Sequence, residues 1–101
     1  LNDYLSLKYS AKTVNLVMAS ELNRDRKVFV TMGGKYLTDE NSGPDVVIDG
    51  DGHSFIMVKD ARLYEVVDNH RYEKDQILRL RMRSEGIHVY AFTFGVYEDG
   101  P

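Results

Sequence analysis

The most constraining feature of this chain is an alternation of apolar and polar side chains with a period of two. Alternation of this kind predicts half-buried β-strands, and a helical period of 3.6 is not sustained in this chain. The segments predicted as strands are residues 4–9, 14–19, 27–32, 46–48, 55–58, 62–67, 76–83 and 86–95, of which residues 14–19 are apolar on both faces, as in a central strand. Turn signals rich in glycine, asparagine and aspartate separate them roughly every ten residues. We therefore predict an all-β fold, a jelly-roll-type β-sandwich of about eight antiparallel strands.

The length of the chain fits one domain with one hydrophobic core. It has 101 residues, and no internal boundary or repeat interrupts the strand pattern. We expect a single β-sandwich domain over residues 1–97 and a tail over residues 98–101. The chain begins at Leu1 without a methionine or a signal peptide, which indicates a segment of a longer protein.

The last alternating segment, residues 86–95, places three aromatic rings on one side of a strand: Tyr90, Phe92 and Phe94. Such a row is typical either of a core strand or of a platform on which a ligand stacks. Residues 78–82 offer a matching aliphatic face, so we predict that the aromatic strand is central and that its rings belong to the core. On that interpretation, replacing Phe92 with alanine would cost about 3 to 5 kcal/mol.

No catalytic or metal-binding motif is visible in the sequence. The chain has no cysteine, and its three histidines, His53, His70 and His88, form no H-x-H or H-E-x-x-H pattern. No G-x-S-x-G sequence marks a serine nucleophile. We therefore expect surface histidines, no cofactor, no metal and no catalytic residue. The net charge of -3 argues against non-specific binding to nucleic acid.

Asp45, Asp49 and Asp51 form an acidic segment that could in principle supply oxygen ligands to calcium. The segment lacks the downstream bidentate glutamate of an EF-hand loop. Aspartate and glycine between two strands are also what a hairpin turn requires. We predict that the acidic segment is a turn.

Two groups of residues remain as candidates for ligand contact. Tyrosines near turns or strand ends can expose a ring, and these are Tyr36, Tyr64, Tyr72 and Tyr97. Three arginines alternate along one strand and form a basic stripe, Arg79, Arg81 and Arg83. The stripe could meet an acidic glycan or an acidic partner, although a solvated outer sheet face explains it equally simply. The absence of tryptophan weakens a carbohydrate-binding interpretation.

Four phrases occur in a defined order along the chain: AKTVNLVM at residues 11–18, GPDV at 43–46, ARLYEVV at 61–67 and GIHVYAFTFG at 86–95. Over residues 5–95 they resemble the C-terminal domain of the DipZ-like thioredoxin proteins. The resemblance implies a carbohydrate-binding-module-like β-sandwich that follows a thioredoxin-like domain. The parent family is associated with thiol–disulfide exchange and cytochrome c biogenesis outside the cytoplasm, on the periplasmic side of the cell envelope.

The resemblance implies a non-catalytic accessory domain of a thioredoxin-like thiol–disulfide oxidoreductase, because the C-x-x-C dithiol of such proteins belongs to the preceding domain. Its expected role is docking or carbohydrate binding, with the preceding domain, a glycan or an envelope protein as partner. We favour docking, because tryptophan is absent and the aromatic strand is predicted to be buried. The alternatives are a stand-alone jelly-roll enzyme or metal-binding domain and a purely structural spacer.

Overall fold

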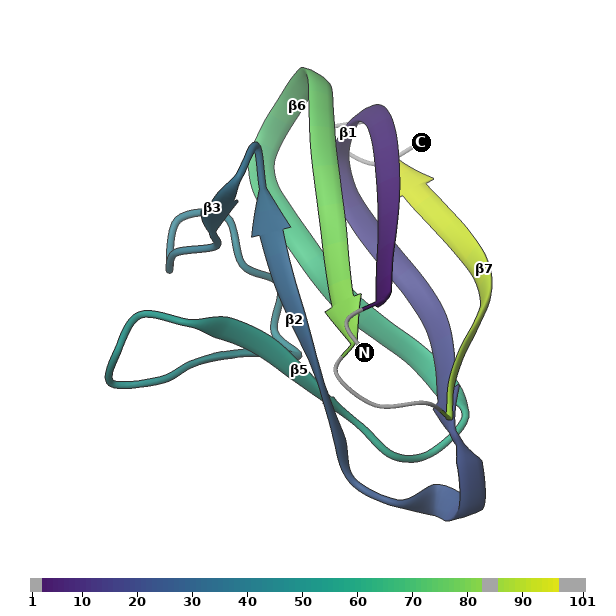
Figure 1. Ribbon diagram of the computed structural model, residues 1–101. Coiled ribbons are helices and arrows are strands. Elements are labelled where there is room, and N and C mark those ends of the chain that lie inside the picture. Colours follow the sequence, from purple (N-terminus) through teal and green to yellow (C-terminus); the bar gives the residue numbers. More distant parts are fainter. Residues whose placement is uncertain (1–2, 83–85, 97–101) are drawn as a thin grey trace.

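A computed structural model describes residues 3–82 and 86–96 of the chain and confirms the all-β sandwich. The strands are β1 (Asp3–Ser20), β2 (Arg26–Met32), β3 (Lys35–Tyr36), β4 (Val46–Ile48), β5 (Ser54–Val58), β6 (Arg62–Met82) and β7 (Ile87–Gly95). They form one antiparallel sheet in the order β4-β5-β2-β6-β1-β7, with β3 paired to β2 (Figure 1). A 3-10 turn, Glu21–Asn23, follows β1. No helix among the described residues is long and apolar enough to cross a membrane.

The two longest strands, β1 and β6, run through both layers of the sandwich. Residues 3–9 of β1 pair with residues 76–82 of β6, and residues 13–18 pair with residues 62–68. Between these ladders the register shifts, and two residues of β6 other than glycine adopt positive φ angles. Both strands arch over at this point (Figure 1). The sheet therefore folds back on itself and encloses the core between its two halves.

The strands predicted from the sequence need correction at β1 and β6, because each of these is one long strand. The segments predicted at 4–9 and 14–19 belong to one strand, and so do the segment at 62–67 and the described part, up to Met82, of the segment at 76–83. One of the predicted turn signals, at residues 68–70, does not end a strand, because β6 bends there, where His70 has a φ of 65°, and continues to Met82. The short strand β3 was not predicted. The sheet therefore has seven strands instead of about eight.

The core is built from the inward positions of both layers, as alternation predicts. Its fully buried side chains include Val14, Leu16, Met18, Val28, Val30, Ile56, Val58, Tyr64, Val66, Leu78 and Leu80. They come from β1, β2, β5 and β6, so one cluster joins both layers.

The aromatic strand β7 is an edge strand, and its predicted central position is wrong. Within the described ranges it pairs with residues 13–20 of β1 alone, whereas residues 78–82 pair with β1 and β2. The predicted core rings are exposed, with 66% of Tyr90, 38% of Phe92 and 42% of Phe94 accessible to solvent. These rings cover the side of the sandwich only partly, because β7 is the outermost strand of the sheet that the described residues form.

A β-bulge separates the orientation of Tyr90 from that of the two phenylalanines. Val17 pairs with Ala91 and Met18 pairs with Val89, so Tyr90 is an extra residue without a partner in the ladder. After the bulge, Phe94 lies opposite buried Val14, on the core side of the sheet. The Phe94 ring stacks on Tyr9 with centroids 5.4 Å apart. Burial raises the pKa of the Tyr9 hydroxyl above its ordinary value.

Replacing Phe92 with alanine is therefore expected to lower the free energy of unfolding by about 1 to 2 kcal/mol, since only part of the ring leaves water on folding. Urea unfolding of the variant measures this loss. A loss above about 3 kcal/mol would equal that of a fully buried ring and would contradict the exposed edge position.

Candidate functional site

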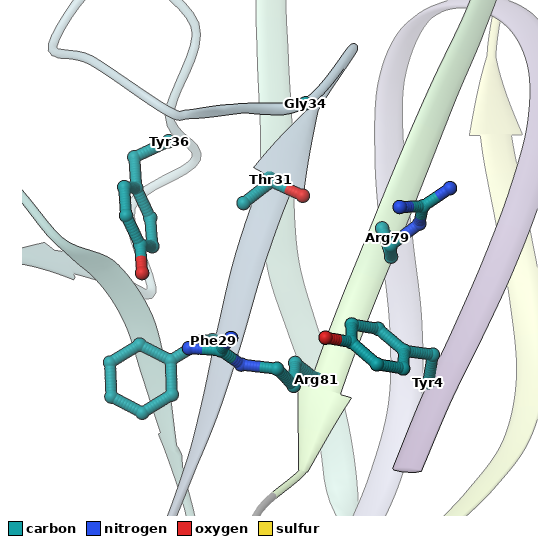
Figure 2. A pocket seen from close by; sticks show the side chains of 7 residues that line it. All are labelled: Tyr4, Phe29, Thr31, Gly34, Tyr36, Arg79 and Arg81. Atoms are coloured by element: carbon teal, nitrogen blue, oxygen red, sulfur yellow. The ribbon is translucent and has the colours of Figure 1, made fainter. Parts of the chain in front are cut away.

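The outer face of β2 and β6 carries a hollow of about 260 Å³, the arginine pocket (Figure 2). It is lined by Tyr4, Phe29, Thr31, Gly34, Tyr36, Arg79 and Arg81. The lining comes from β1, β2, β3, β6 and the turn between β2 and β3. Aromatic and basic side chains thus meet in one place, although they lie far apart in the sequence.

Strand alternation explains why these side chains point out of the sandwich. In β6, Leu78 and Leu80 are fully buried, so Arg79 and Arg81 face outward between them. The same alternation in β2 turns Phe29 and Thr31 outward beside buried Val28 and Val30.

Strand register then brings the outward side chains together. Arg81 lies opposite Phe29 of β2 on one side and opposite Tyr4 of β1 on the other. Arg79 lies opposite Thr31 in the next outward row. Residues directly opposite each other share a face and come within side-chain contact.

The turn between β2 and β3 adds Tyr36 to this face. Gly33 and Gly34 adopt positive φ angles of 59° and 84°, which glycine tolerates best. This tight turn pairs Tyr36 with Thr31. The Tyr36 ring also packs against the His53 ring, with centroids 4.8 Å apart, and this contact supports the Tyr36 ring.

The two arginines are held by aromatic rings and by a hydroxyl group. The guanidinium of Arg81 lies 5.7 Å from the centroid of Phe29, and that of Arg79 lies 5.9 Å from the centroid of Tyr4. The Nε of Arg79 donates to the hydroxyl of Ser6 at 3.2 Å. The pocket lining contains no carboxylate, and neither arginine forms an ion pair with another residue in the described ranges.

The structure brings together Tyr36, Arg79 and Arg81 from the residues that the sequence suggested as ligand contacts. Tyr72 is 41% exposed but does not line the pocket. Arg83 and Tyr97 lie outside the described residues. The expectation of an exposed ring at Tyr64 is wrong, because this tyrosine is 1% exposed and belongs to the core.

Sequence reasoning missed Tyr4 and Phe29 as pocket residues. Both occupy outward positions of alternating segments, which was visible in the sequence. Their proximity to the arginines depends on which strands are neighbours, and alternation does not reveal this.

Each histidine lies beside a single carboxylate. His53 lies 3.7 Å from Asp49, His70 lies 3.6 Å from Asp68, and His88 lies 3.2 Å from Glu21. Within residues 3–82 and 86–96, no three histidine, aspartate or glutamate side chains are placed to hold a metal ion.

The acidic segment splits into two separate structural elements. Asp49 caps a turn, since its carboxylate accepts hydrogen bonds from the amides of Asp51 and His53 at 2.9 and 3.0 Å. Asp45 instead accepts from the guanidinium of Arg62 at 3.0 Å and from the amide of Glu65 at 2.7 Å. We call this second arrangement the Asp45–Arg62 latch.

The latch predicts a pH dependence of stability. Burial tends to raise the pKa of Asp45, but the hydrogen bonds from Arg62 and the Glu65 amide outweigh burial and hold it below its usual value. The stabilisation is thus present above the unfolded carboxyl pKa of about 3.9 and is lost as the pH falls through the lower pKa of the folded state. In urea unfolding across this range, the advantage of the native chain over Asp45→Asn should shrink toward acid pH. An advantage that does not change with pH would contradict the latch.

Comparison with known proteins identifies a family match. The family model described as "Thioredoxin like C-terminal domain" matches residues 2–95. No curated protein and no solved structure matches the chain.

Proposed function

Because the chain belongs to the family of thioredoxin-like C-terminal domains, we propose that it serves a thiol–disulfide oxidoreductase as a non-catalytic module that binds a carbohydrate in the arginine pocket. Membership of this family makes the chain an accessory domain of thioredoxin-like proteins, in which a thioredoxin-like domain precedes it in the same polypeptide. The chain has no cysteine, so any dithiol reaction belongs to that preceding domain.

The observation that carries the proposal is the grouping of three aromatic rings around two arginines in one hollow. The apolar face of a sugar ring stacks on an aromatic ring, and tyrosine offers both a flat face and a polar hydroxyl. The exposed fraction of Tyr4 is 57%, so this ring is open to a ligand. The two reasons for preferring docking were the missing tryptophan and a buried aromatic strand. The second no longer holds for this chain.

The proposal extends to the parent protein. The four phrases that resemble the DipZ-like proteins favour a parent that acts outside the cytoplasm, in thiol–disulfide exchange linked to cytochrome c biogenesis. A glycan of the cell envelope would then be the ligand, and its binding would hold the redox domain near envelope substrates.

An NMR titration of the isotopically labelled chain with neutral and acidic oligosaccharides tests the proposal. We expect saturable shifts at the amides of Thr31, Tyr36 and Arg81 with at least one sugar. If no sugar in the panel shifts these amides, carbohydrate binding in the pocket is wrong.

A second candidate function is docking of the preceding domain on the same face. The supporting observation is the position of Tyr4, a pocket residue close to Asp3, where β1 begins. A preceding domain would therefore lie near the arginine pocket. Spectra of the chain with and without the preceding thioredoxin-like domain distinguish the two functions. Docking predicts that the pocket amides shift when the domain is attached and that sugars no longer reach them.

A further inference from the structure

We infer that the ligand of the arginine pocket is an acidic sugar whose carboxylates bind Arg79 and Arg81 while its rings pack on the aromatic side chains. This inference rests on the proposed carbohydrate binding and adds the chemical class of the ligand. It depends on the charge, the free hydrogen-bond donors and the shape of the pocket.

The charge of this face is opposite to that of the whole chain. The chain carries a net charge of -3, yet Arg79 and Arg81 line a pocket without a carboxylate. Lys27, at an outward position of the same strand as Phe29, has its Nζ 4.5 Å from the centroid of Phe55, and its charge is partly balanced by the Asp49 carboxylate. The carboxylate of Asp49 accepts from two backbone amides of its own turn and does not line the pocket. The face is therefore locally basic and attracts an anion.

The arginines retain hydrogen-bond donors for a ligand. A guanidinium has five N–H groups and no acceptor. Arg79 uses its Nε for Ser6, which leaves its two terminal amino groups. Among the described residues, no hydrogen bond or ion pair joins the guanidinium group of Arg81 to a partner. A carboxylate accepts two parallel N–H bonds from such a fork, and charge makes these bonds stronger than neutral ones.

The aromatic side chains provide surfaces beside the charges. In Figure 2, Tyr36 and Phe29 lie on one side of the pocket and Tyr4 on the other, and the Arg81 side chain reaches from β6 toward the Phe29 ring. A sugar that contacts these rings would present one carboxylate to Arg81, whose guanidinium lies over Phe29 of β2, and another to Arg79, whose guanidinium lies beside Tyr4 and Ser6 of β1. The volume of about 260 Å³ lies just below the usual range for drug-sized ligands, so it suits a short saccharide.

A neutral sugar fits this arrangement less well. It would bury the rings but leave two guanidinium groups without an anion, so it would gain none of the charge-assisted hydrogen bonds. A simple inorganic anion has the opposite defect, because it pairs with the arginines and leaves the rings in water. The pocket therefore favours a ligand that carries both features.

Two probes with the same sugar rings test the inference: digalacturonic acid, whose carboxylates are charged, and its dimethyl ester, which is neutral. NMR titrations of the 101-residue chain at fixed ionic strength give both dissociation constants. We expect saturable shifts at the pocket amides with the acid and binding at least about tenfold weaker with the ester. Inorganic phosphate in a third titration should bind at least about tenfold more weakly than the acid, since it lacks the ring.

Variants assign the effect to the pocket. Arg81→Gln and Arg79→Gln should each weaken the acid by about tenfold and leave the ester unchanged. Tyr36→Ala should weaken both sugars. Arg71→Gln is the matched control, because Arg71 pairs with Glu73 and does not line the pocket, and it should bind like the native chain. Unfolding midpoints confirm that each variant is folded.

The results of these titrations distinguish the acidic class of the ligand from carbohydrate binding in general. Equal binding of acid and ester, with loss of both in Tyr36→Ala, would keep carbohydrate binding and overturn the acidic class. Phosphate that binds as tightly as the acid would also overturn it, because the rings would then contribute nothing. Absence of binding by every sugar would overturn both claims. If the attached thioredoxin-like domain occupies the pocket and excludes the acid, the pocket is a docking site and the inference fails.

Discussion

Replacing Tyr64 with alanine is expected to lower the free energy of unfolding by about 3 to 5 kcal/mol, the largest loss that we predict. The ring is 1% exposed and belongs to the core cluster. Its hydroxyl donates to the carbonyl of Asp60 at 2.8 Å and accepts from the amide of Lys59 at 3.0 Å. The Arg62 guanidinium lies 3.9 Å from its ring centroid. Alanine would open a cavity in the core and leave the Asp60 carbonyl and the Lys59 amide without their hydrogen-bond partner.

Two further variants separate the parts of this loss in urea unfolding. Tyr64→Phe keeps the ring and removes the hydroxyl, so it should cost about 1 to 2 kcal/mol. Tyr90→Ala is the control, because Tyr90 is 66% exposed, and it should change stability by no more than about 0.5 kcal/mol. If Tyr64→Ala and Tyr90→Ala cost the same, Tyr64 is not a core residue.

Tyr64 also shows what the family-like phrases do in this fold. The GPDV phrase at residues 43–46 and the ARLYEVV phrase at residues 61–67 meet in the Asp45–Arg62 latch. Arg62 contacts both the Asp45 carboxylate and the Tyr64 ring. None of these residues lines the arginine pocket. These two phrases therefore mark positions that stabilise the fold, and ligand specificity has to be read from other residues.

The all-β class was predictable because alternation depends only on which positions are buried. The number of strands was not, because the sequence signals for a turn and for a bend within a strand overlap. Residues 68–70, Asp-Asn-His, have the composition of a turn. His70 adopts a positive φ there, yet β6 continues on the other side. Long-range pairing with β1 decides this outcome, and no local pattern reports it.

The position of β7 at the edge was unpredictable for a related reason. An apolar segment of nine residues fits a central strand as well as an edge strand. The bulge at Tyr90 changes which side chains share a face, and one extra residue reverses the alternation after it. The exposure of Phe92 and Phe94 follows from the position of β7 at the edge of the described sheet, not from the residues themselves.

The site was half visible in the sequence. Arg79 and Arg81 stood out as a stripe, and Tyr36 followed a Gly-Gly turn. The sequence could not show that Tyr4 and Phe29 flank the stripe, because this depends on the register of β1, β6 and β2. The composition of the arginine stripe suggested a solvated outer face. The hollow in which aromatic rings surround the arginines forms only when the strands assemble into the sheet.

Gly43 offers the second large effect, because the chain packs backbone against backbone at this position. Its amide donates to the carbonyl of Val66 at 2.8 Å, and Ser42 forms a β-bridge with Val67. The loop thereby covers the edge of β6 that β1 does not pair. An added Cβ would lie 2.7 Å from the carbonyl carbon of Glu65 and 2.9 Å from that of Val66. Both atoms belong to the backbone, so the loop or the strand would have to move.

Gly43→Ala is therefore expected to cost about 1 to 3 kcal/mol in urea unfolding, although it adds only one methyl group. Gly50→Ala is the matched control, since no atom lies within 4 Å of its added Cβ, and it should stay within about 0.5 kcal/mol of the native chain. The displaced loop also carries Asp45, so Gly43→Ala should lose part of the pH dependence that the latch confers. A variant as stable as the Gly50 control, with the native pH dependence, would show that the loop does not hold the β6 edge. The sandwich would then depend on its core alone.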